Sequence, residues 1–434
     1  MVDGTGRTMQ SQDAEHANAH ANAHTNAHTS THTDAQDFPR WFEGSEYMHR
    51  VARAIAKYGP IARTTLAQML GLSQGAMSRI TSDLIYAGVI EEIPGDAVTT
   101  GPLPQGFTPK TKEGATRRGR PQTALRLRAD ARTFIGIKAQ GASAIAAVVN
   151  AHGEVVSSRH ERAFPGRSPQ QVTAALATLV RECRDDVAGT PLPTPTAVGV
   201  AVGGHVRDER DVTFAPFLRW DHDVPLAAML EEATGLPCTV YNDIDALLVD
   251  ASWFGPGVGL EAFAVLTIGV GVGYSLAVRG EPVTYPDKSY GLLGHVLIDP
   301  EGPRCTAGHI GCAQCLTDDA IVEQYAQMIG HPCTFEDFAA DARAGMPLAS
   351  RLTDRTCFRL GSLIATIANI AMPSKVMVAG ESAFLATIGI DAVRDGIRRY
   401  RHSQAAQVEF TVVDHDWQLW AKAAASRAIV RYIG

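Results

Sequence analysis

Close to the N-terminus, the apolar residues follow a helical period that ends at a glycine. Val51, Ala54, Ile55 and Tyr58 stand at positions i, i+3, i+4 and i+7, and therefore share one face of a helix. The glycine and proline that follow Tyr58 end this helix, because proline lacks the backbone N–H that the next turn needs. The pattern predicts a first helix that buries one apolar stripe.

Two further helices follow, and a short turn separates them. The second is expected over residues 63–70, and the third over residues 73–87 with Ser73 as its N-cap. Gly71 suits the tight turn between them, and Gly88 ends the third helix before a strand. The third helix is expected to bury four apolar residues, Met77, Ile80, Leu84 and Ile85.

Two short helices joined by a glycine turn and followed by a β-hairpin are typical of a winged helix-turn-helix domain. The exposed N-terminal half of the third helix is the part that reaches base edges in the major groove. Its expected contacts with a double-stranded DNA operator are Ser73, Gln74, Ser78 and Arg79. The alternative is an ordinary three-helix module with a solvated polar face.

The wing of this domain is expected to be long. Residues 94–114 are rich in glycine, proline and threonine, which predicts an extended flexible loop. The loop leads to a basic arm that contains Arg117, Arg118 and Arg120. Arginines in an extended chain can lie in a narrow A·T minor groove, where the negative potential is enhanced. A solvated basic linker is the alternative interpretation.

Residues 1–40 form a low-complexity tail in which histidine recurs at every fourth position from His16 to His32. Such a segment has little apolar surface to offset the entropy of ordering, so we expect it to be disordered. It is either a passive tail or a weak metal-chelating one.

Strands alternate with helices after residue 128, and glycines follow several of the strands. This alternation predicts an α/β body with ligand sites at the strand ends. Strands are expected at residues 134–137, 144–149, 154–156, 197–204, 238–241, 262–268 and 375–378. Helices are expected at residues 169–187 and 226–234, and before residue 253. The chain thus divides into a tail (1–40), a DNA-binding domain (41–128) and a body (129–434).

The composition is that of an ordinary globular protein, with 434 residues of which 45% are hydrophobic and 20% are charged. No apolar run approaches the length of a membrane span, and the polar N-terminus lacks the apolar core of a signal peptide. Seven cysteines, an odd number in a large chain, do not suggest a disulfide framework. We therefore expect a cytoplasmic protein without membrane contact.

The net charge of -7 is unevenly distributed along the chain. Residues 50–128 carry 12 Lys and Arg against 5 Asp and Glu, so a basic module is joined to an acidic remainder. This asymmetry is typical of a nucleic-acid-binding segment fused to a soluble domain.

Three of the seven cysteines, Cys305, Cys312 and Cys315, fall within eleven residues, and His295 lies just upstream. Thiolates at this spacing, among small residues, are typical of a chain that wraps a tetrahedral metal ion. A loop with ordinary thiols is the alternative.

The order of these features resembles the ROK family (repressors, open reading frames and sugar kinases), and in particular its transcriptional regulators. The resemblance covers about residues 45–434. It is carried by the Arg-Gly-Arg-Pro arm, residues 220–226, Tyr241-Asn242-Asp243, the glycine loop 269–273, and Gly294-His295 with the cysteine cluster. It implies a two-lobed actin-like ATPase fold of the RNase H-like kind, a small sugar-type effector in the cleft, and a homodimer or homotetramer.

Two phosphate motifs of the family's sugar kinases are altered in this chain. The family motif Asp-x-Gly-x-Thr corresponds to the run from Lys138 to Ala142, and a lysine cannot hold a magnesium ion. In the second motif, Gly-Thr-Gly-x-Gly, Val270 replaces the threonine whose hydroxyl would face a phosphate. We therefore expect no phosphoryl transfer; a sugar kinase with an appended DNA-binding head is the alternative.

The resemblance also implies a sugar site, of which about half is present. Asn242, Asp243 and His295 match the family's sugar-binding residues, and in the kinases that aspartate is the general base. Leu292 and Gln314 replace two glutamates, which should weaken binding of a plain hexose. Leu292 would make room for an apolar or N-acyl group, and Gln314 would still form hydrogen bonds. A vestigial cleft that binds nothing is the alternative.

The family's metal pattern, Cys-x-Cys-Gly-x-x-Gly-Cys, is changed as well, because Ala307 stands at the middle cysteine. Cys315 is additional and forms a Cys-x-x-Cys pair with Cys312. We expect a structural zinc ion with the ligands His295, Cys305, Cys312 and Cys315, and His309 is the fallback ligand.

These expectations together predict a non-enzymatic transcriptional regulator, a repressor of carbohydrate uptake or metabolism genes that a sugar or sugar derivative controls. An effector-independent DNA-binding protein is a further alternative.

Overall fold

The computed structural model describes residues 38–94, 102–110, 123–285, 287–288 and 290–434. The expected His-rich tail lies almost wholly outside the described residues, as do parts of the wing and the arginines Arg117, Arg118 and Arg120. Residues 40–434 belong to one compact unit.

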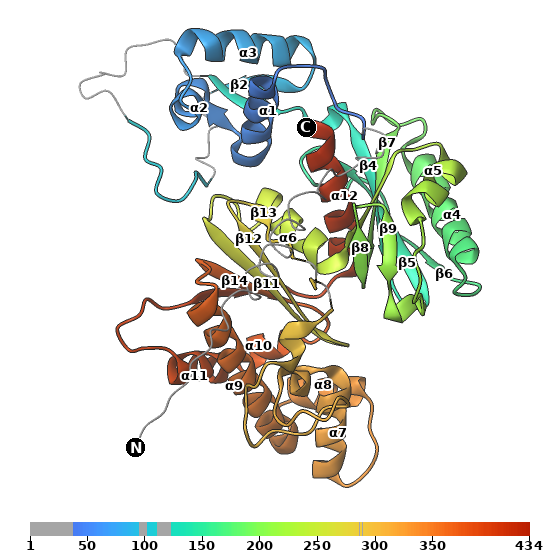
Figure 1. Ribbon diagram of the computed structural model, residues 1–434, viewed down its shortest axis with the longest axis vertical. Helices are drawn as coiled ribbons and strands as arrows, with labels where there is room; N and C mark the ends of the chain where they lie inside the picture. Colours follow the sequence, from blue (N-terminus) through green and yellow to red (C-terminus); the bar gives the residue numbers. More distant parts are fainter. Residues whose placement is uncertain (1–37, 95–101, 111–122, 286, 289) are drawn as a thin grey trace, which may run out of the picture. The chain divides into compact units, whose positions relative to one another are not determined.

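Three helices and a small sheet form the N-terminal part of this unit (Figure 1). The helices are α1 (Glu46–Tyr58), α2 (Arg63–Leu70) and α3 (Gln74–Tyr86). The strands β1 (Ile61–Ala62), β3 (Thr123–Leu127) and β2 (Ile90–Pro94) pair antiparallel in that order. Gly71 has a left-handed backbone (φ 68°), as the turn between α2 and α3 requires. This is the arrangement of a winged helix-turn-helix.

The buried stripe of α3 differs from the predicted one. Met77, Thr81 and Leu84 are buried, because they follow one another at helical spacing on the inner face. Thr81 is tolerated there since its hydroxyl donates a hydrogen bond to the carbonyl of Met77 over 2.9 Å. The prediction that Ile85 belongs to the core was wrong, because 36% of this residue is exposed.

Two five-stranded sheets form the body, and their topologies match. The first contains, in order, β10 (Cys238–Asn242), β7 (Pro195–Val202), β4 (Thr133–Ala139), β5 (Ser143–Asn150) and β6 (His160–Ala163). The second contains β15 (Glu409–Val412), β14 (Lys375–Ala379), β11 (Ala262–Ile268), β12 (Val272–Val278) and β13 (Glu281–Pro282). In each sheet the first three strands are parallel and the last two join antiparallel. The repeated topology defines two related lobes.

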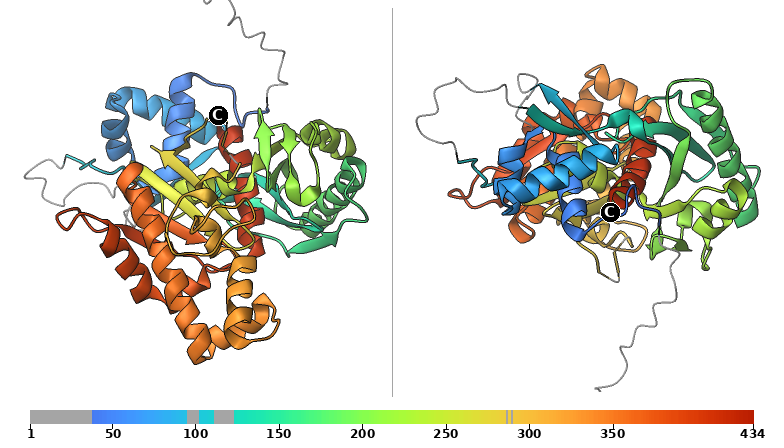
Figure 2. Two further views of the ribbon diagram at one scale, coloured as in Figure 1. Left: turned by 60° about the horizontal axis from the view of Figure 1, so that its bottom comes forward. Right: turned by 90° about the horizontal axis from the view of Figure 1, so that it is seen from above.

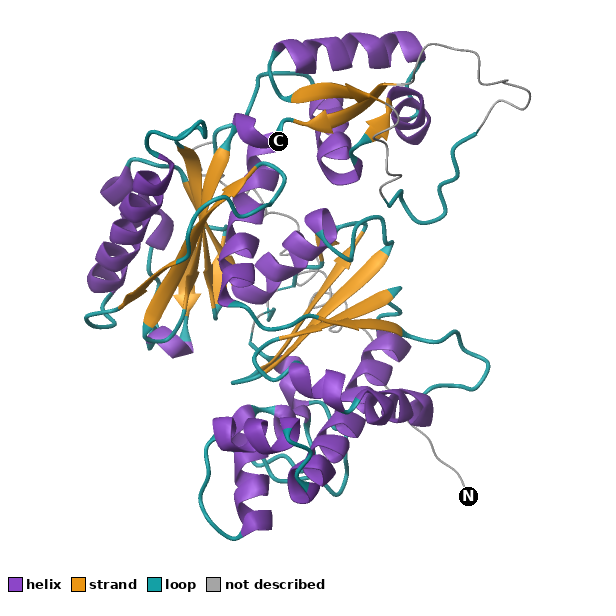
Figure 3. Ribbon diagram, turned by 180° about the vertical axis from the view of Figure 1, so that it is seen from behind, coloured by secondary structure: helices purple, strands orange, loops and turns teal. Residues whose placement is uncertain are grey.

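Each lobe has its own helical layer, and two helices lie between the sheets (Figures 1 and 3). The first lobe carries α4 (Pro169–Val187) and α5 (Leu226–Thr234). The second carries α7 (Asp318–Ile329), α8 (Phe335–Arg343), α9 (Pro347–Ile370), α10 (Phe384–Ile388) and α11 (Ile390–Tyr400). Between the sheets lie α6 (Asp243–Phe254) and α12 (Trp417–Ile433). Within the described residues, no helix is long and apolar enough to cross a membrane.

The helix α12 packs directly on the first sheet, as the further views show (Figure 2). Glycines make this close approach possible. A Cβ atom at Gly136 on β4 would lie 1.8 Å from the carbonyl oxygen of Ala421, and one at Gly199 on β7 would lie 2.0 Å from that of Ala424. A larger residue at either glycine would push α12 away from the sheet.

Several strands were not predicted from the sequence. They are β6, β12, β13, β15 and the hairpin of β8 (His205–Arg207) and β9 (Asp211–Phe214). The glycine loop was expected at residues 269–273, yet β12 begins inside it at Val272 and pairs with the whole length of β11. The predicted strand at residues 154–156 is only a single bridge between Val149 and Val155.

The described part of the wing, residues 102–110, is attached at both of its ends. The backbone N–H of Gln105 donates to the carbonyl of Gly259 over 2.6 Å, and its side-chain oxygen accepts from the hydroxyl of Ser374 over 2.9 Å. At the other end, the backbone of Lys110 exchanges hydrogen bonds of 2.8 and 3.2 Å with the Gln68 amide on α2. Residues 102–110, which were expected to belong to a flexible loop, therefore form a segment docked on the rest of the protein.

Candidate functional site

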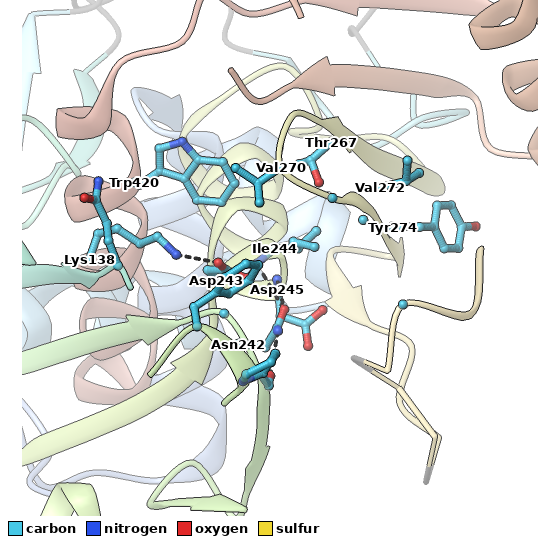
Figure 4. Close-up of a pocket in the computed structure, with 18 of the residues that line it drawn as sticks. Lys138, Asn242, Asp243, Ile244, Asp245, Thr267, Val270, Val272, Tyr274 and Trp420 are labelled. Atoms are coloured by element: carbon cyan, nitrogen blue, oxygen red, sulfur yellow. Dashed lines mark hydrogen bonds and ion pairs between the residues drawn. The ribbon is translucent and has the colours of Figure 1, made fainter. Parts of the chain in front are cut away.

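A cavity of about 430 Å³ lies between the two lobes, where strands of both sheets end. The first sheet contributes the ends of β4, β7 and β10, and the second contributes the glycine loop 269–273 and the end of β14. Trp417 and Trp420 from α12 complete the wall, and Trp420 is labelled in Figure 4. Strand ends are a common place for ligands in α/β folds, because the loops there vary while the sheet stays rigid.

Lys138 and Asp243, which both line the cavity, form an ion pair. The Lys138 ammonium donates a hydrogen bond to Asp243 Oδ2 (Figure 4), and the two side chains are only 7% and 14% exposed. The ammonium also lies 5.4 Å from the ring centre of Trp420. The carboxylate that would act as a base in a kinase therefore already has a buried cationic partner.

Asn242 lines the cavity but uses most of its side chain to hold the local structure. Its Oδ1 caps α6 by accepting from the backbone N–H groups of Ile244 and Asp245 over 3.0 and 3.2 Å. Its Nδ2 donates to the carbonyl of Gly204 over 2.8 Å. One N–H of the amide is left for a ligand.

Asp245, which was not predicted as a site residue, also lines the cavity. It is 8% exposed, accepts a hydrogen bond from the Ser275 hydroxyl, and forms an ion pair with Lys288 over 2.9 Å. Lys288 in turn donates to the carbonyl of Val283 over 2.6 Å. Asp245 thus connects α6 to the second lobe. It stands in the first turn of α6, where an acidic residue is favourable to the helix dipole whether or not it belongs to a site.

Aromatic side chains form much of the remaining wall. They are Phe217, Tyr274, Tyr285, Trp417 and Trp420. None of them was predicted, because they come from four separate segments and no sequence motif links them. Leu292 lines the cavity too and is 55% exposed, so it lies at the open side. Rings of this kind offer apolar faces on which a sugar ring can stack.

The structure separates the four predicted effector-binding residues. Asn242 and Asp243 line the cavity, whereas His295 and Gln314 do not. Gln314 packs against Gly294, where an added Cβ atom would lie 2.3 Å from its Nε2. His295 is exposed and belongs to a different cluster.

That cluster consists of His295, Cys305, His309 and Cys312, and it could hold a metal ion. One ligand atom from each residue lies within 4.8 Å of the others. The Nδ1 atoms of the two histidines are 3.1 Å apart, and Cys305 Sγ lies 3.9 Å from His295 Nδ1. Two imidazoles and two thiols are a ligand set that suits tetrahedral zinc.

Cys315, which the sequence suggested as a ligand, lies outside this cluster. It is 2% exposed and packs in the core of the second lobe beside Leu316 and Ala313. Burial is the main reason that the pKa of its thiol is raised to about 11, which disfavours the thiolate that a metal needs. His309, the fallback ligand, stands in the cluster instead, because the loop turns back over four residues so that Cys305 N–H donates to the His309 carbonyl over 2.9 Å.

The residues of α3 that were predicted to contact DNA lie in the N-terminal half of this helix. Ser73 caps the helix, and its hydroxyl accepts from the backbone N–H of Ala76 over 3.2 Å. Gln74, Ser78 and Arg79 are all exposed. These three side chains are therefore available to a partner.

The two related α/β lobes around a cleft have an actin-like fold of the sugar-kinase type, and a winged helix-turn-helix head precedes them. The ROK family profile matches residues 134–418. This chain belongs to the ROK family.

Relatives of both kinds match the chain. The N-acetylglucosamine repressor of Escherichia coli O157:H7 is 25% identical over 344 residues, which are 76% of this chain and 79% of the repressor. The glucokinase of Thermotoga maritima is 26% identical over 264 residues, which are 57% of this chain and 81% of the kinase.

A solved structure shares the fold across the head and both lobes. It is a ROK family transcriptional regulator, a homologue of the E. coli Mlc protein. It superposes with a TM-score of 0.68 at 24% identity and covers 89% of this chain and 96% of its own. The kinase relative, by contrast, lacks a counterpart for much of this chain.

Proposed function

We propose that this protein is a DNA-binding transcriptional repressor of carbohydrate uptake or metabolism genes, and that a sugar or sugar derivative in the cavity controls it. The observation that carries the proposal is the attachment of the helix-turn-helix head to both walls of the cavity. The repressors among its relatives support this function.

The first attachment joins α1 of the head to the end of α12. His49 Nδ1 contacts the carbonyl of Ile433 over 3.0 Å, and Arg53 contacts the carbonyl of Gly434 over 3.4 Å. The other end of α12 carries Trp417 and Trp420 in the cavity wall. One helix therefore extends from the proposed effector to the head.

The second attachment joins α1 to α6 and the second lobe. Arg53 forms an ion pair with Glu281 on β13 over 2.7 Å, and its guanidinium lies 5.2 Å from the ring centre of Trp253. The Lys57 ammonium lies 5.4 Å from the same ring. Trp253 lies in the last turn of α6, the helix that Asn242 caps in the cavity. A second helix thus joins cavity and head.

Two-lobed proteins of this kind respond to ligands by rotating one lobe relative to the other. Because the head is attached to both α12 and the second lobe, such a rotation would strain these contacts and change the placement of α3. An effector shifts DNA binding only as far as it prefers one lobe arrangement over the other. In a homodimer or homotetramer, the change would alter the spacing of two heads on paired half-sites.

A kinase function finds less support. Phosphoryl transfer needs a metal at the phosphates and an available base. The Lys138 ammonium stands where the family's kinases place an aspartate, and it pairs with Asp243. We therefore propose that the chain is not an enzyme, and that the phosphorylation of N-acetylglucosamine or glucose with ATP stays at background.

The experiment that tests the function selects genomic fragments bound by the full chain and measures affinity with and without sugars. We expect a sugar such as N-acetylglucosamine or glucose to weaken operator binding at least fivefold. Arg79→Ala should weaken binding and relax sequence preference, whereas Arg120→Ala should weaken it and flatten its salt dependence. If the protein binds DNA specifically, but no sugar raises its thermal stability or changes its operator affinity, the result would instead favour an effector-independent DNA-binding protein.

We also propose that the cluster of His295, Cys305, His309 and Cys312 holds a structural zinc ion. The short helices Leu292–His295 and Ala313–Leu316 both border it, and Leu292 at the start of the first lines the cavity. Zinc at this place would stiffen one rim of the cleft, and it would have no part in chemistry.

A further inference from the structure

Glu381 lies at the glycine-loop end of the cavity. It follows β14 and is one of the residues that line the cavity. A Cβ atom added to Gly269 would lie 2.1 Å from Glu381 Oε2. The carboxylate therefore rests directly against the first glycine of the loop, in space that only a glycine leaves free.

The backbone that carries Glu381 is held firmly against that loop. Gly380 has a φ of 102°, and a Cβ atom there would lie 2.3 Å from the carbonyl oxygen of Ile268. On the other side, the N–H of Ser382 donates to the same carbonyl over 3.1 Å. Gly380 and Ser382 therefore both contact the last residue of β11, and Glu381 lies between them in the chain.

Asp318 strengthens this connection and adds a second acidic group. Its backbone N–H donates to the carbonyl of Gly269 over 2.9 Å, and its carboxylate accepts from the Ser382 hydroxyl. The glycine loop is therefore bordered by two carboxyl groups.

The charge of the cavity is negative around the loop. Among the described residues that line it, Lys138 is the single cationic side chain, and Asp243, Asp245 and Glu381 are acidic. Lys138 forms an ion pair with Asp243, and Lys288 forms one with Asp245. For Glu381 the described residues provide no ion-pair partner within 4.0 Å, and burial raises the pKa of its carboxyl.

We propose that Glu381 makes the cleft selective for an effector without a phosphate group, an uncharged or amine-bearing sugar. The inference rests on the proposed sugar-controlled function. Backbone N–H groups of a glycine loop commonly cradle phosphate, but here the carboxylate of Glu381 lies beside the first glycine of that loop. A phosphate would meet like charge at short range in a partly desolvated site, whereas a hydroxyl or ammonium would donate a hydrogen bond to Glu381.

The test compares sugars that differ by one phosphate. Calorimetric titration of the full chain would use N-acetylglucosamine and glucose, each beside its 6-phosphate. We expect the free sugar to bind at least tenfold more tightly than its 6-phosphate. In Glu381→Gln this ratio should fall at least threefold, because the amide keeps the shape and removes the charge. Glu232→Gln, which removes an exposed charge on α5, is the matched control and should leave the ratio unchanged.

Each result supports or overturns the inference. A 6-phosphate that binds the wild-type protein as tightly as the free sugar overturns it, and so does a ratio that Glu381→Gln leaves unchanged. Binding of a 6-phosphate that appears only in Glu381→Gln supports it. If no form binds either protein, both this inference and the sugar-controlled function fail; if the free sugar changes operator affinity but its 6-phosphate does so equally, this inference alone fails.

Discussion

The Lys422 ammonium on α12 donates a hydrogen bond to the Asp250 carboxylate on α6 over 2.8 Å. Asp250 is 3% exposed and also accepts from the Ser426 hydroxyl over 2.7 Å. This pair connects the two helices that extend from the cavity to the head. The helices should therefore move as one unit.

The first prediction concerns this connection. Asp250→Asn keeps a hydrogen-bond acceptor but removes the charge that holds Lys422. We expect operator affinity without sugar to stay within twofold of the wild type. The change in affinity that sugar causes should become several-fold smaller, because the coupling free energy between two sites is usually only about 1–3 kcal/mol. Fluorescence anisotropy with a labelled operator measures both. Asp395→Asn, which breaks an exposed ion pair with Arg398 on α11, is the control and should change neither. Full sugar response in Asp250→Asn would show that the two helices transmit independently.

The second prediction concerns the ion pair inside the cavity. Lys138→Met should destabilise the protein by about 3–5 kcal/mol, because Asp243 would stay buried without its partner. Adding Asp243→Asn should recover more than half of that loss. Urea unfolding of both single variants and the double variant gives the coupling energy, and losses that simply add would contradict a dependent pair.

The third prediction concerns pH and the Lys57 side chain. Burial chiefly lowers the pKa of Lys57 from 10.5 to about 8, and the nearby Glu281 partly offsets this. Between about pH 8 and 10.5 the unfolded chain therefore binds more protons at this site, so the free energy of unfolding should rise with pH in that window. Below pH 8 a charged ammonium must stay desolvated in the folded protein.

Lys57→Met should accordingly be more stable than the wild type at pH 7, by about 1–2 kcal/mol once the lost contacts with the Trp253 ring are included. The advantage should shrink by pH 10. Urea unfolding at both pH values measures this, with Lys110→Met at an exposed position as the control. A difference that does not vary with pH would contradict the buried ammonium.

The fourth prediction concerns the metal. Protein that lacks residues 1–37 should purify with about one zinc ion per chain, measured by inductively coupled plasma mass spectrometry. His309→Ala and Cys312→Ser should lose the ion, since both side chains belong to the cluster. Cys315→Ser should keep it and lose only stability, because that thiol lies in the core. If Cys315→Ser loses zinc and His309→Ala keeps it, then Cys315 and not His309 is the fourth ligand. A zinc content near zero in the protein without these substitutions would rule out the metal site.

The fifth prediction concerns the docked part of the wing. Gln105→Ala removes side-chain hydrogen bonds to the N–H of Glu261 and the hydroxyl of Ser374. We expect faster hydrogen exchange over residues 102–110 and a stability change below about 1 kcal/mol, as is usual for exposed bonds. Gln404→Ala in another exposed loop should leave that exchange unchanged. Unaltered exchange in Gln105→Ala would mean that backbone contacts alone hold the segment.

Much of the architecture follows from local sequence. The second and third helices of the head, and the helices at residues 169–187 and 226–234, were predicted within a residue or two, because apolar period, caps and glycines act over short distances. The same holds for β11, a continuous apolar run between turn residues. The identity of Lys138 and the glycine loop were sufficient to argue against phosphoryl transfer.

Other features depend on which segments meet in space. No local pattern distinguishes β12 from a glycine loop, since its conformation comes from pairing with β11. The sequence favoured Cys315 as the fourth ligand and gave His309 only as the fallback. The packing of the core reversed this order, because it buries the Cys315 thiol and places the His309 imidazole near Cys312. The sequence by itself was sufficient for the helices of the head, several helices and strands of the body and the family resemblance, because these depend on local patterns. The tertiary structure alone placed Glu381 on the glycine loop and attached the head to both lobes, because these contacts join residues that are more than a hundred positions apart.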